Sequence, residues 1–356
     1  GQRRALTRPP SPAISSDLSM SWADRLRHAW RQRGPLARLL WPLSQLYAAA
    51  VRRQQRRWAA QPPARADVPV IVVGNVIAGG AGKTPVTLAL LEHLRARGWH
   101  PGVVSRGYGR RTTDCREVRS DSLALDVGDE PLLIARRAQV PVFVARQRMQ
   151  AVQALRQAHP RINLIVCDDG LQHLALARDV EICVFNDDGV GNGWLLPAGP
   201  LREPWPRPVD AVLHAGAAPQ GENAPRFALA RQLAPFAVDA HGKQVLLSTL
   251  QGAPLHAVAG IARPERFFAM LRAQGLRVER AEAFPDHSHF DSLYRPNPLA
   301  WRLICTEKDA VKLWARHPDA LAVPLEVQIA PAFFAWIDAR LSALTARPVS
   351  SAPSSV

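Results

Sequence analysis

The stretch Val68–Pro85, which reads VPVIVVGNVIAGGAGKTP, decides the fold. Its first half is an apolar run rich in valine and isoleucine, which is typical of a buried strand. The run leads into a glycine-rich turn that ends in Gly-Lys-Thr, and the pattern over Thr84–Arg97 is helical. A strand, a glycine-rich turn and a helix N-terminus together form an anion site, because backbone N–H groups and the helix dipole point at the ligand. The stretch therefore predicts a phosphate-binding loop.

The residues of this loop have separate expected roles. Lys83 is predicted to reach the β- and γ-phosphates of a nucleoside triphosphate, and Thr84 to ligate Mg²⁺. Ile77 stands where the usual G-x-x-x-x-G-K-[ST] pattern has its first glycine. Ala78 stands where MinD-type ATPases have a lysine, which argues against a dimerising ATPase of that type. The alternative is a turn that only packs strand against helix. The predicted nucleotide-binding residues are Ile77, Ala78, Gly79, Gly80, Ala81, Gly82, Lys83 and Thr84.

Two adjacent carboxylates predict a metal partner for the loop. The apolar run Ile162–Cys167 predicts a buried strand that ends in Asp168 and Asp169. A phosphate loop needs a carboxylate at the end of a neighbouring buried strand to orient Mg²⁺. Two adjacent acids at a strand end are also costly without a cation. We therefore predict Thr84, Asp168 and Asp169 as metal ligands, and the alternative is a turn that carries two solvated acids.

Composition limits the class of protein. The 356 residues suffice for two domains, and the apolar content of 47% is that of a globular protein. The formal net charge of +15 indicates an anionic partner, such as nucleic acid, an acidic membrane surface or a phosphorylated substrate. The four cysteines are scattered, which argues against a disulfide framework or a zinc site and favours a reducing cytosolic compartment. No stretch is apolar for about 20 residues, as a membrane-spanning helix would be.

Apolar runs alternate with helical patterns along the rest of the chain, and strands are predicted at Pro101–Ser105, Val180–Phe185 and Arg302–Thr306. Because the strands read as continuous apolar runs, a parallel sheet covered on both faces is expected. The predicted fold is α/β: a P-loop NTPase-like parallel-sheet domain, a second, smaller α/β domain and an N-terminal amphipathic helix. The expected boundaries are a disordered extension at 1–19, a basic amphipathic helical segment at 20–60, the nucleotide-binding domain at 61–225, the smaller domain at 226–345 and a disordered tail at 346–356.

The segment Trp22–Arg57 is helix-prone and strongly basic. Its apolar residues Leu39, Leu40, Leu43, Leu46, Tyr47 and Ala50 follow the spacing of one helix face. Such a face either lies among lipids, with arginines at anionic headgroups, or packs on the protein core. Nucleic-acid binding is disfavoured, because no helix-turn-helix or aromatic-interleaved pattern accompanies the charge.

Four further stretches carry polar residues that a plain core does not need. SRGYGR (Ser105–Arg110) follows a predicted strand and is expected at the same sheet edge as the phosphate loop, where α/β proteins bind ligands. VGDEP (Val127–Pro131) places two acids at a loop-to-helix junction. FPDHSHF (Phe284–Phe290) and TEKDAVKL (Thr306–Leu313) lie in the second α/β unit. Each stretch alone has a structural explanation, such as acids that favour a helix N-terminus.

Together these stretches resemble the tetraacyldisaccharide 4′-kinases of lipid A synthesis. The matches follow the family's order, and DDGLQH, LPAGPLREP and TEKDAVK are specific in combination. Ile77 fits the resemblance, since the family's loop commonly lacks that first glycine. The matching stretches are Gly74–Pro85, Ser105–Arg110, Gly128–Pro131, Asp168–His173, Leu196–Pro204, Gly260–Phe268, Asp286–His287 and Thr306–Leu313.

The resemblance implies a kinase that moves the γ-phosphate of ATP, with Mg²⁺, to the 4′-hydroxyl of lipid A disaccharide 1-phosphate to give lipid IVA. In such enzymes an aspartate and a histidine pair, which correspond here to Asp129 and His287. Asp129 takes or orients the hydroxyl proton, His287 supports it, and Lys83 stabilises charge on the transferring group.

The resemblance also implies where the protein works. An acceptor with a phosphate and four acyl chains is an anionic lipid, which suits the basic N-terminal helix and Arg106 and Arg202 as substrate-binding residues. A peripheral monomer is expected on the cytoplasmic face of the inner membrane of a Gram-negative bacterium, with no nucleic-acid partner. The alternatives are a P-loop regulatory NTPase, which gives Asp129 and His287 no role, and a nucleotide-dependent membrane adaptor without turnover.

Overall fold

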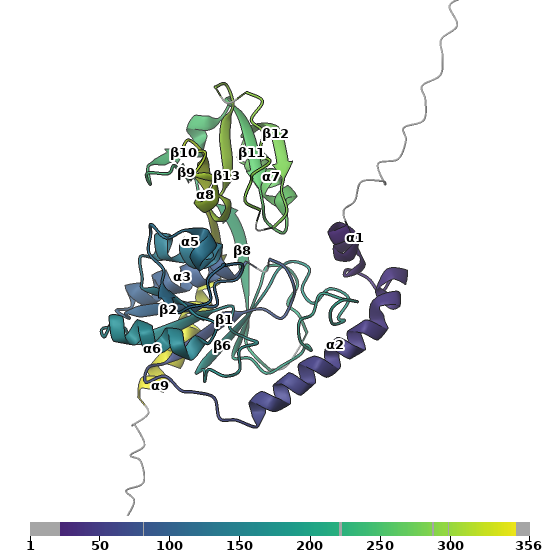
Figure 1. The fold of residues 1–356 in the computed structure, drawn as a ribbon, viewed down its shortest axis with the longest axis vertical. Coiled ribbons are helices and arrows are strands. Elements are labelled where there is room, and N and C mark those ends of the chain that lie inside the picture. Colours follow the sequence, from purple (N-terminus) through teal and green to yellow (C-terminus); the bar gives the residue numbers. More distant parts are fainter. Residues whose placement is uncertain (1–21, 81, 221–222, 287, 298, 347–356) are drawn as a thin grey trace, which may run out of the picture.

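The structure, a computed structural model, describes residues 22–80, 82–220, 223–286, 288–297 and 299–346. Figure 1 shows two layered units with a long helix beside the larger one. The expected extension 1–19 and residues 347–356 of the expected tail lie outside the described residues. So do Ala81 and His287.

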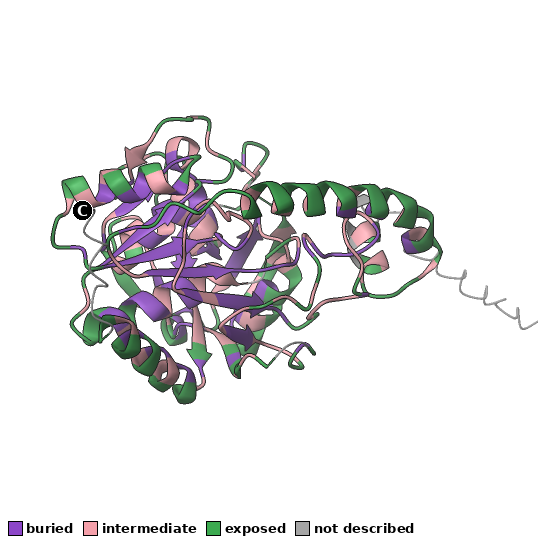
Figure 2. Ribbon diagram, turned by 90° about the horizontal axis from the view of Figure 1, so that it is seen from below, coloured by how far each residue is buried: buried purple, intermediate pink, exposed green. Residues whose placement is uncertain are grey.

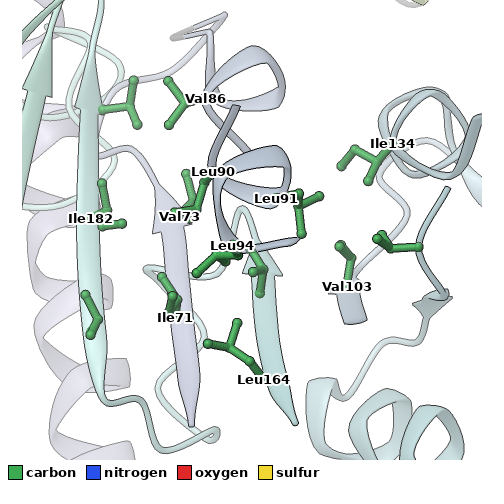
Figure 3. Packing of buried hydrophobic residues seen from close by; sticks show 14 of the residues in the cluster. Ile71, Val73, Val86, Leu90, Leu91, Leu94, Val103, Ile134, Leu164 and Ile182 are labelled. Atoms are coloured by element: carbon green, nitrogen blue, oxygen red, sulfur yellow. The ribbon is translucent and has the colours of Figure 1, made fainter. Parts of the chain in front are cut away.

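The predicted strand, loop and helix are present at the centre of the larger unit. Strand β1 (Val70–Gly74) is fully buried, and helix α3 (Lys83–Ala96) begins at the loop's lysine. The apolar face of α3, including Leu90 and Leu94, packs on Ile71 of β1, as Figure 3 shows. Each buried leucine stabilises the fold by about 1.5–3 kcal/mol relative to an exposed one. The packing therefore fixes β1 and α3, the two elements that flank the loop, against each other.

Among the described residues, nine strands form the sheet of the larger unit. Six neighbouring pairs are parallel, and the two edge strands β15 and β3 pair antiparallel. The predicted α/β fold with a parallel sheet is thus confirmed. In sheet order the strands are β15 (Leu325–Ile329), β8 (Arg226–Leu233), β7 (Ala211–His214), β6 (Val180–Phe185), β1, β5 (Leu164–Asp168), β2 (Pro101–Ser105), β4 (Val142–Val144) and β3 (Arg116–Glu117).

Each face of this sheet has its own apolar core, because side chains alternate along a strand. Ile71 and Val73 belong to the core on one face, while Val70 and Val72 belong to the core on the other. Helices α3, α5 (Asp129–Ala138) and α9 (Pro331–Thr345) cover the first face, and α6 (Arg148–Ala158) covers the second. The short helix α4 (Ala124–Val127) precedes α5.

The smaller unit is a second sheet with its own cores. Its helices are α7 (Pro264–Ala273), α8 (Glu307–Leu313) and the 3₁₀ turn η1 (Leu247–Leu250). In sheet order its strands are β10 (Gln244–Leu246), β9 (Phe236–Val238), β14 (Leu321–Val323), β13 (Arg302–Thr306), β11 (Pro254–Ala259) and β12 (Arg277–Ala283).

The chain enters the smaller unit from β8 and leaves it into β15, and these two strands pair with each other in the larger sheet. The sequence pattern suggested that 226–345 forms one contiguous smaller domain. The strand order shows that it does not. Its first strand, its last strand and helix α9 complete the larger unit, and the second sheet is inserted between them. The long-range pairing of Leu229 with Ile329 explains why the local pattern did not reveal this.

The N-terminal segment forms two helices, α1 (Trp22–Ala29) and α2 (Pro35–Ala59), along the outside of the larger unit (Figure 1). Helix α2 is attached through a stripe of small buried residues, Ala37, Ser44 and Ala48. Ser44 donates to the Leu196 carbonyl at 3.1 Å. The outer side of α2 forms a continuous exposed surface in Figure 2. Within the described part of the chain, no helix is both long and apolar enough to cross a membrane.

Candidate active site

A cavity of about 1560 Å³ lies between the two units, at the carboxyl ends of β1, β2 and β5. The phosphate loop and the Asp168-Asp169 turn line it from the larger unit. The segments 261–270 and 306–308 line it from the smaller one. Ligands of α/β proteins bind at this edge of the sheet, outside the carboxyl ends of the strands. The predicted loop, acids and polar stretches therefore face one cavity.

The loop's start is anchored by residues that replace its missing glycine. Ile77 is buried in the core and forms an isolated β-bridge with Leu201. The Ala78 N–H donates to the Pro200 carbonyl at 2.7 Å. The start of the loop therefore packs against the LPAGPLREP segment. An isoleucine at 77 contributes packing that a glycine could not.

The loop's end does require glycine. Gly82 has a φ of +77°, and an added Cβ would lie 2.6 Å from the guanidinium of Arg231 on β8. A side chain at this position would strain the backbone, and the Arg231 guanidinium would have to shift to make room for it. Sequence reasoning missed Arg231, which lines the cavity beside the loop, because its strand pairs with a segment far along the chain.

A polar cluster holds Lys83 in place. Its Nζ lies 3.2 Å from Asn75 Oδ1 and 3.4 Å from Asp169 Oδ1. Arg202 Nη1 lies 3.2 Å from each of the same two oxygens. Burial alone would raise the pKa of Asp169, but Lys83 and Arg202 outweigh it and lower that pKa. Asn75, a buried amide directly after β1, was missed at the sequence level, although a polar residue at a strand end was the available signal.

Asp168 is the first of the two carboxylates predicted to bind a metal. It is buried at the end of β5 and accepts a 3.1 Å hydrogen bond from Thr87. Burial raises its pKa to about 7, with Asp169 adding to the rise and Lys83 opposing it. Thr84, Asp168 and Asp169 line the same cavity. The described residues hold no cluster of three or more His, Cys, Asp or Glu side chains for a metal. The hydroxyl of Thr84 and the carboxylates of Asp168 and Asp169 offer oxygen donors, the type of ligand that Mg²⁺ prefers.

Asp129 lies at the start of α5, and its side chain is nearly buried. Its Oδ2 lies 2.7 Å from Lys312 Nζ on α8. The next residue, Glu130, lines the cavity and pairs with Lys308 at 2.9 Å. Because His287 lies outside the described residues, its pairing with Asp129 stays a prediction. Sequence reasoning did not single out Lys312, although it lies in the TEKDAVKL stretch.

The two predicted substrate-binding arginines differ in their surroundings. Arg106 is exposed and lines the cavity after β2, whereas Arg202 is tied to Asp169 beside the phosphate loop. Nearby, His173 is kept neutral at pH 7. Burial, followed by the charges of Arg148, Arg178 and Arg106, lowers its pKa to about 4.

Comparisons with known proteins identify the family of this chain. The sequence model of tetraacyldisaccharide-1-P 4′-kinase matches residues 36–342. The chain is 66% identical to a tetraacyldisaccharide 4′-kinase from Acidovorax sp. (strain JS42), over 91% of this chain and 96% of that protein. It is 61% identical to the one from Delftia acidovorans, over 90% and 96%. The crystal structure of LpxK from Aquifex aeolicus in complex with ATP matches with a TM-score of 0.75 and 25% identity, over 86% of this chain and 99% of that one. The chain belongs to the tetraacyldisaccharide 4′-kinase family.

Proposed function

We propose that the cavity transfers the γ-phosphate of ATP to the 4′-hydroxyl of a lipid A disaccharide 1-phosphate, which gives lipid IVA and ADP. The observation that carries this proposal is the meeting of two features at one cavity. Lys83 and Asp168, the predicted nucleotide and metal residues, line the cavity, and so does Glu130, which follows Asp129 at the start of α5. Both sheets contribute to the walls, as expected for a site that closes around two substrates.

The donor side would work through residues of the phosphate loop and the acids beside it. Lys83 would leave Asp169 for the β- and γ-phosphate oxygens, where its charge stabilises the transferring group. Thr84, Asp168 and Asp169 would hold Mg²⁺, which neutralises charge on the phosphates in phosphoryl transfer. The loop backbone from Ile77 to Gly82 would cradle the phosphates.

On the acceptor side Asp129 would act as the base. Its carboxylate takes the proton of the 4′-hydroxyl as the O4′–P bond forms and the bond between the γ-phosphorus and the β–γ bridging oxygen breaks, so that ADP leaves with that oxygen. His287, within the Asp-His motif, would support Asp129. Arg106 and Arg202 would bind the anionic acceptor as point charges or bidentate partners.

The location would be a membrane surface. Leu39, Leu43 and Leu46 lie on the exposed side of α2, although they are large and apolar. Arginines flank them on the same helix. An interfacial helix buries such a face among lipids while its cations meet anionic headgroups, at about 1 kcal/mol per basic residue. We propose that a monomer binds in this way at the cytoplasmic side of the inner membrane, where it meets its lipid acceptor.

One experiment tests the activity. The purified protein is incubated with γ-labelled ATP, Mg²⁺, detergent and lipid A disaccharide 1-phosphate, and the lipid is separated and counted. We expect label in the lipid and none when the acceptor is omitted. An unlabelled lipid with released phosphate would identify a regulatory NTPase. ATP binding without turnover would identify an adaptor, and either result would contradict the proposal.

A further inference from the structure

Two helices from different units are joined by a ladder of ion pairs. Helix α5 begins with Asp129 and Glu130, and α8 carries Lys308 and Lys312 one helical turn apart, so that both lysines lie on one face. Lys312 Nζ lies 2.7 Å from Asp129 Oδ2, and Lys308 Nζ lies 2.9 Å from Glu130 Oε1. Figure 1 shows α8 next to α5 at the junction of the units. The ladder therefore bridges the two walls of the cavity.

The Lys312–Asp129 pair is more deeply buried than the Lys308–Glu130 pair. The two side chains are only 6% and 8% exposed. A buried charge is costly unless it is paired, and removal of one partner leaves the other uncompensated. Lys312 also donates to the Ser288 carbonyl at 3.1 Å, and Ser288 follows His287 in the sequence. One ammonium group thus holds both the proposed base and the chain segment that carries its proposed support.

We propose that Lys312 is a positioning residue for the phosphate transfer. It keeps the Asp129 carboxylate ionised and fixes its orientation, and it does so only when the smaller unit lies against the larger one. Closure of the cavity thereby completes the base. This inference rests on the proposed role of Asp129. It predicts that loss of Lys312 raises the pKa of Asp129, because a buried carboxylate without its counter-charge favours the protonated form.

Other charged groups lie on α5 and on the helices packed against it. Lys308 pairs with Glu130, and Arg137 pairs with Glu307 at 2.6 Å, whereas Lys312 pairs with Asp129. The remaining titratable or charged side chains on α5 and on the helices packed against it are Arg136 on α5, Asp309 on α8, Asp126 on α4, and Lys83, Glu92, His93 and Arg95 on α3.

The test is the pH profile of kcat/KM for lipid phosphorylation, measured on Lys312→Met and Lys312→Arg. We expect the acid limb of Lys312→Met to move up by about 1–3 pH units, the range for loss of an adjacent opposite charge. At alkaline pH the rate should then recover all but the part that is lost with the fixed orientation of Asp129. Lys312→Arg keeps the charge and should keep the acid limb. The control is Arg316→Met, which removes an exposed cation just beyond α8 and should change neither limb nor rate.

A second measurement tests whether Lys312 acts through Asp129. In an Asp129→Asn background, Lys312→Met should lower kcat/KM by less than about twofold, since the group it positions is gone. A full loss in that background, or an equal loss at every pH, would overturn the proposal. Should Lys312→Met not fold, Lys312→Gln carries the same expectation. The wild-type reaction is measured first, so that absent lipid labelling refutes the proposed function, while a wild-type-like profile in the variant refutes the role of Lys312.

Discussion

Lys83 Nζ lies 3.4 Å from Asp169 Oδ1, so the lysine of the phosphate loop is held by an acid of the neighbouring strand end. When ATP binds, the Lys83 ammonium exchanges this carboxylate for phosphate oxygens, which carry a higher negative charge. We expect Lys83→Met to lower kcat by about 10²–10³-fold, as loss of one donor to a developing charge does. Steady-state lipid phosphorylation measures this effect. The control is Lys243→Met, which removes an exposed lysine of the smaller unit; a similar loss there would contradict a local role for Lys83.

Asp168 should govern the requirement for Mg²⁺. Its carboxylate is buried and faces the cavity together with Thr84. We expect Asp168→Asn to raise the Mg²⁺ concentration for half-maximal rate by about tenfold or more, because one anionic ligand of a hard cation is lost. Magnesium titrations of the rate measure it, with Glu92→Gln on the exposed side of α3 as the control. An unchanged titration would remove Asp168 from the metal site.

Local pattern was sufficient for much of the fold. The strands predicted at Pro101–Ser105, Val180–Phe185 and Arg302–Thr306 agree with the structure residue for residue, because continuous apolar runs bounded by polar residues have sharp ends. Strands β8 and β15 escaped this reasoning. Their partly exposed residues include arginine and glutamate, and their identity as strands comes from pairing with each other across the inserted unit.

The candidate site likewise contains residues that local sequence could predict and residues that it could not. The phosphate loop and the Asp168-Asp169 turn were predictable because each is contiguous in the sequence and has a chemical reason for its spacing. Lys312 and Arg231 were not, since their positions depend on how the second unit folds back on the first. Side chains that meet across such an insertion leave no local periodicity for a pattern to detect.

Asp129 should be required for transfer but not for nucleotide binding. We expect Asp129→Asn and His287→Ala each to lower turnover by about 10²-fold or more, the scale of general-base losses. ATP affinity should stay within a few-fold of the wild-type value, because the phosphate loop is untouched. Single-turnover kinetics and equilibrium nucleotide binding separate the two quantities. Asp121→Asn, at an exposed turn, is the control. A near-normal rate in either variant would exclude that residue from the mechanism.

Asp309 should make the folded state sensitive to pH. Its side chain is buried on α8 and accepts hydrogen bonds from Thr306 and the Gly260 N–H, but burial dominates and raises its pKa from 3.8 to about 6. Between these values the folded state binds more protons than the unfolded state, so stability falls as pH rises. Relative to Asp309→Asn, the wild type should lose on the order of 3 kcal/mol across this window, at about 1.4 kcal/mol per pKa unit.

Urea unfolding of both proteins between pH 3.5 and about 7 measures this difference. Asp319→Asn supplies a control of opposite sign. Burial would raise the pKa of Asp319, but its hydrogen bonds with Arg295 lower it, so the wild type should gain stability over that variant as pH rises. If the difference in unfolding free energy between the wild type and Asp309→Asn did not change with pH, the Asp309 carboxyl would not be a source of pH-dependent stability.

Helix α2 should bind anionic membranes through its exposed leucines. Leu39, Leu43 and Leu46 are 76%, 53% and 69% exposed, and they lie within one helical surface that the protein itself does not cover. We expect the triple change of these residues to serine to lower partitioning onto phosphatidylglycerol-containing vesicles by about tenfold or more, because each buried leucine contributes about 1.5–3 kcal/mol. Vesicle flotation measures it, and rates on detergent-dispersed lipid should be unchanged. Leu123→Ser, at 65% exposure on the larger unit, controls for lost surface hydrophobicity. Equal partitioning of the triple variant and the wild type would mean that α2 serves only as a packed helix.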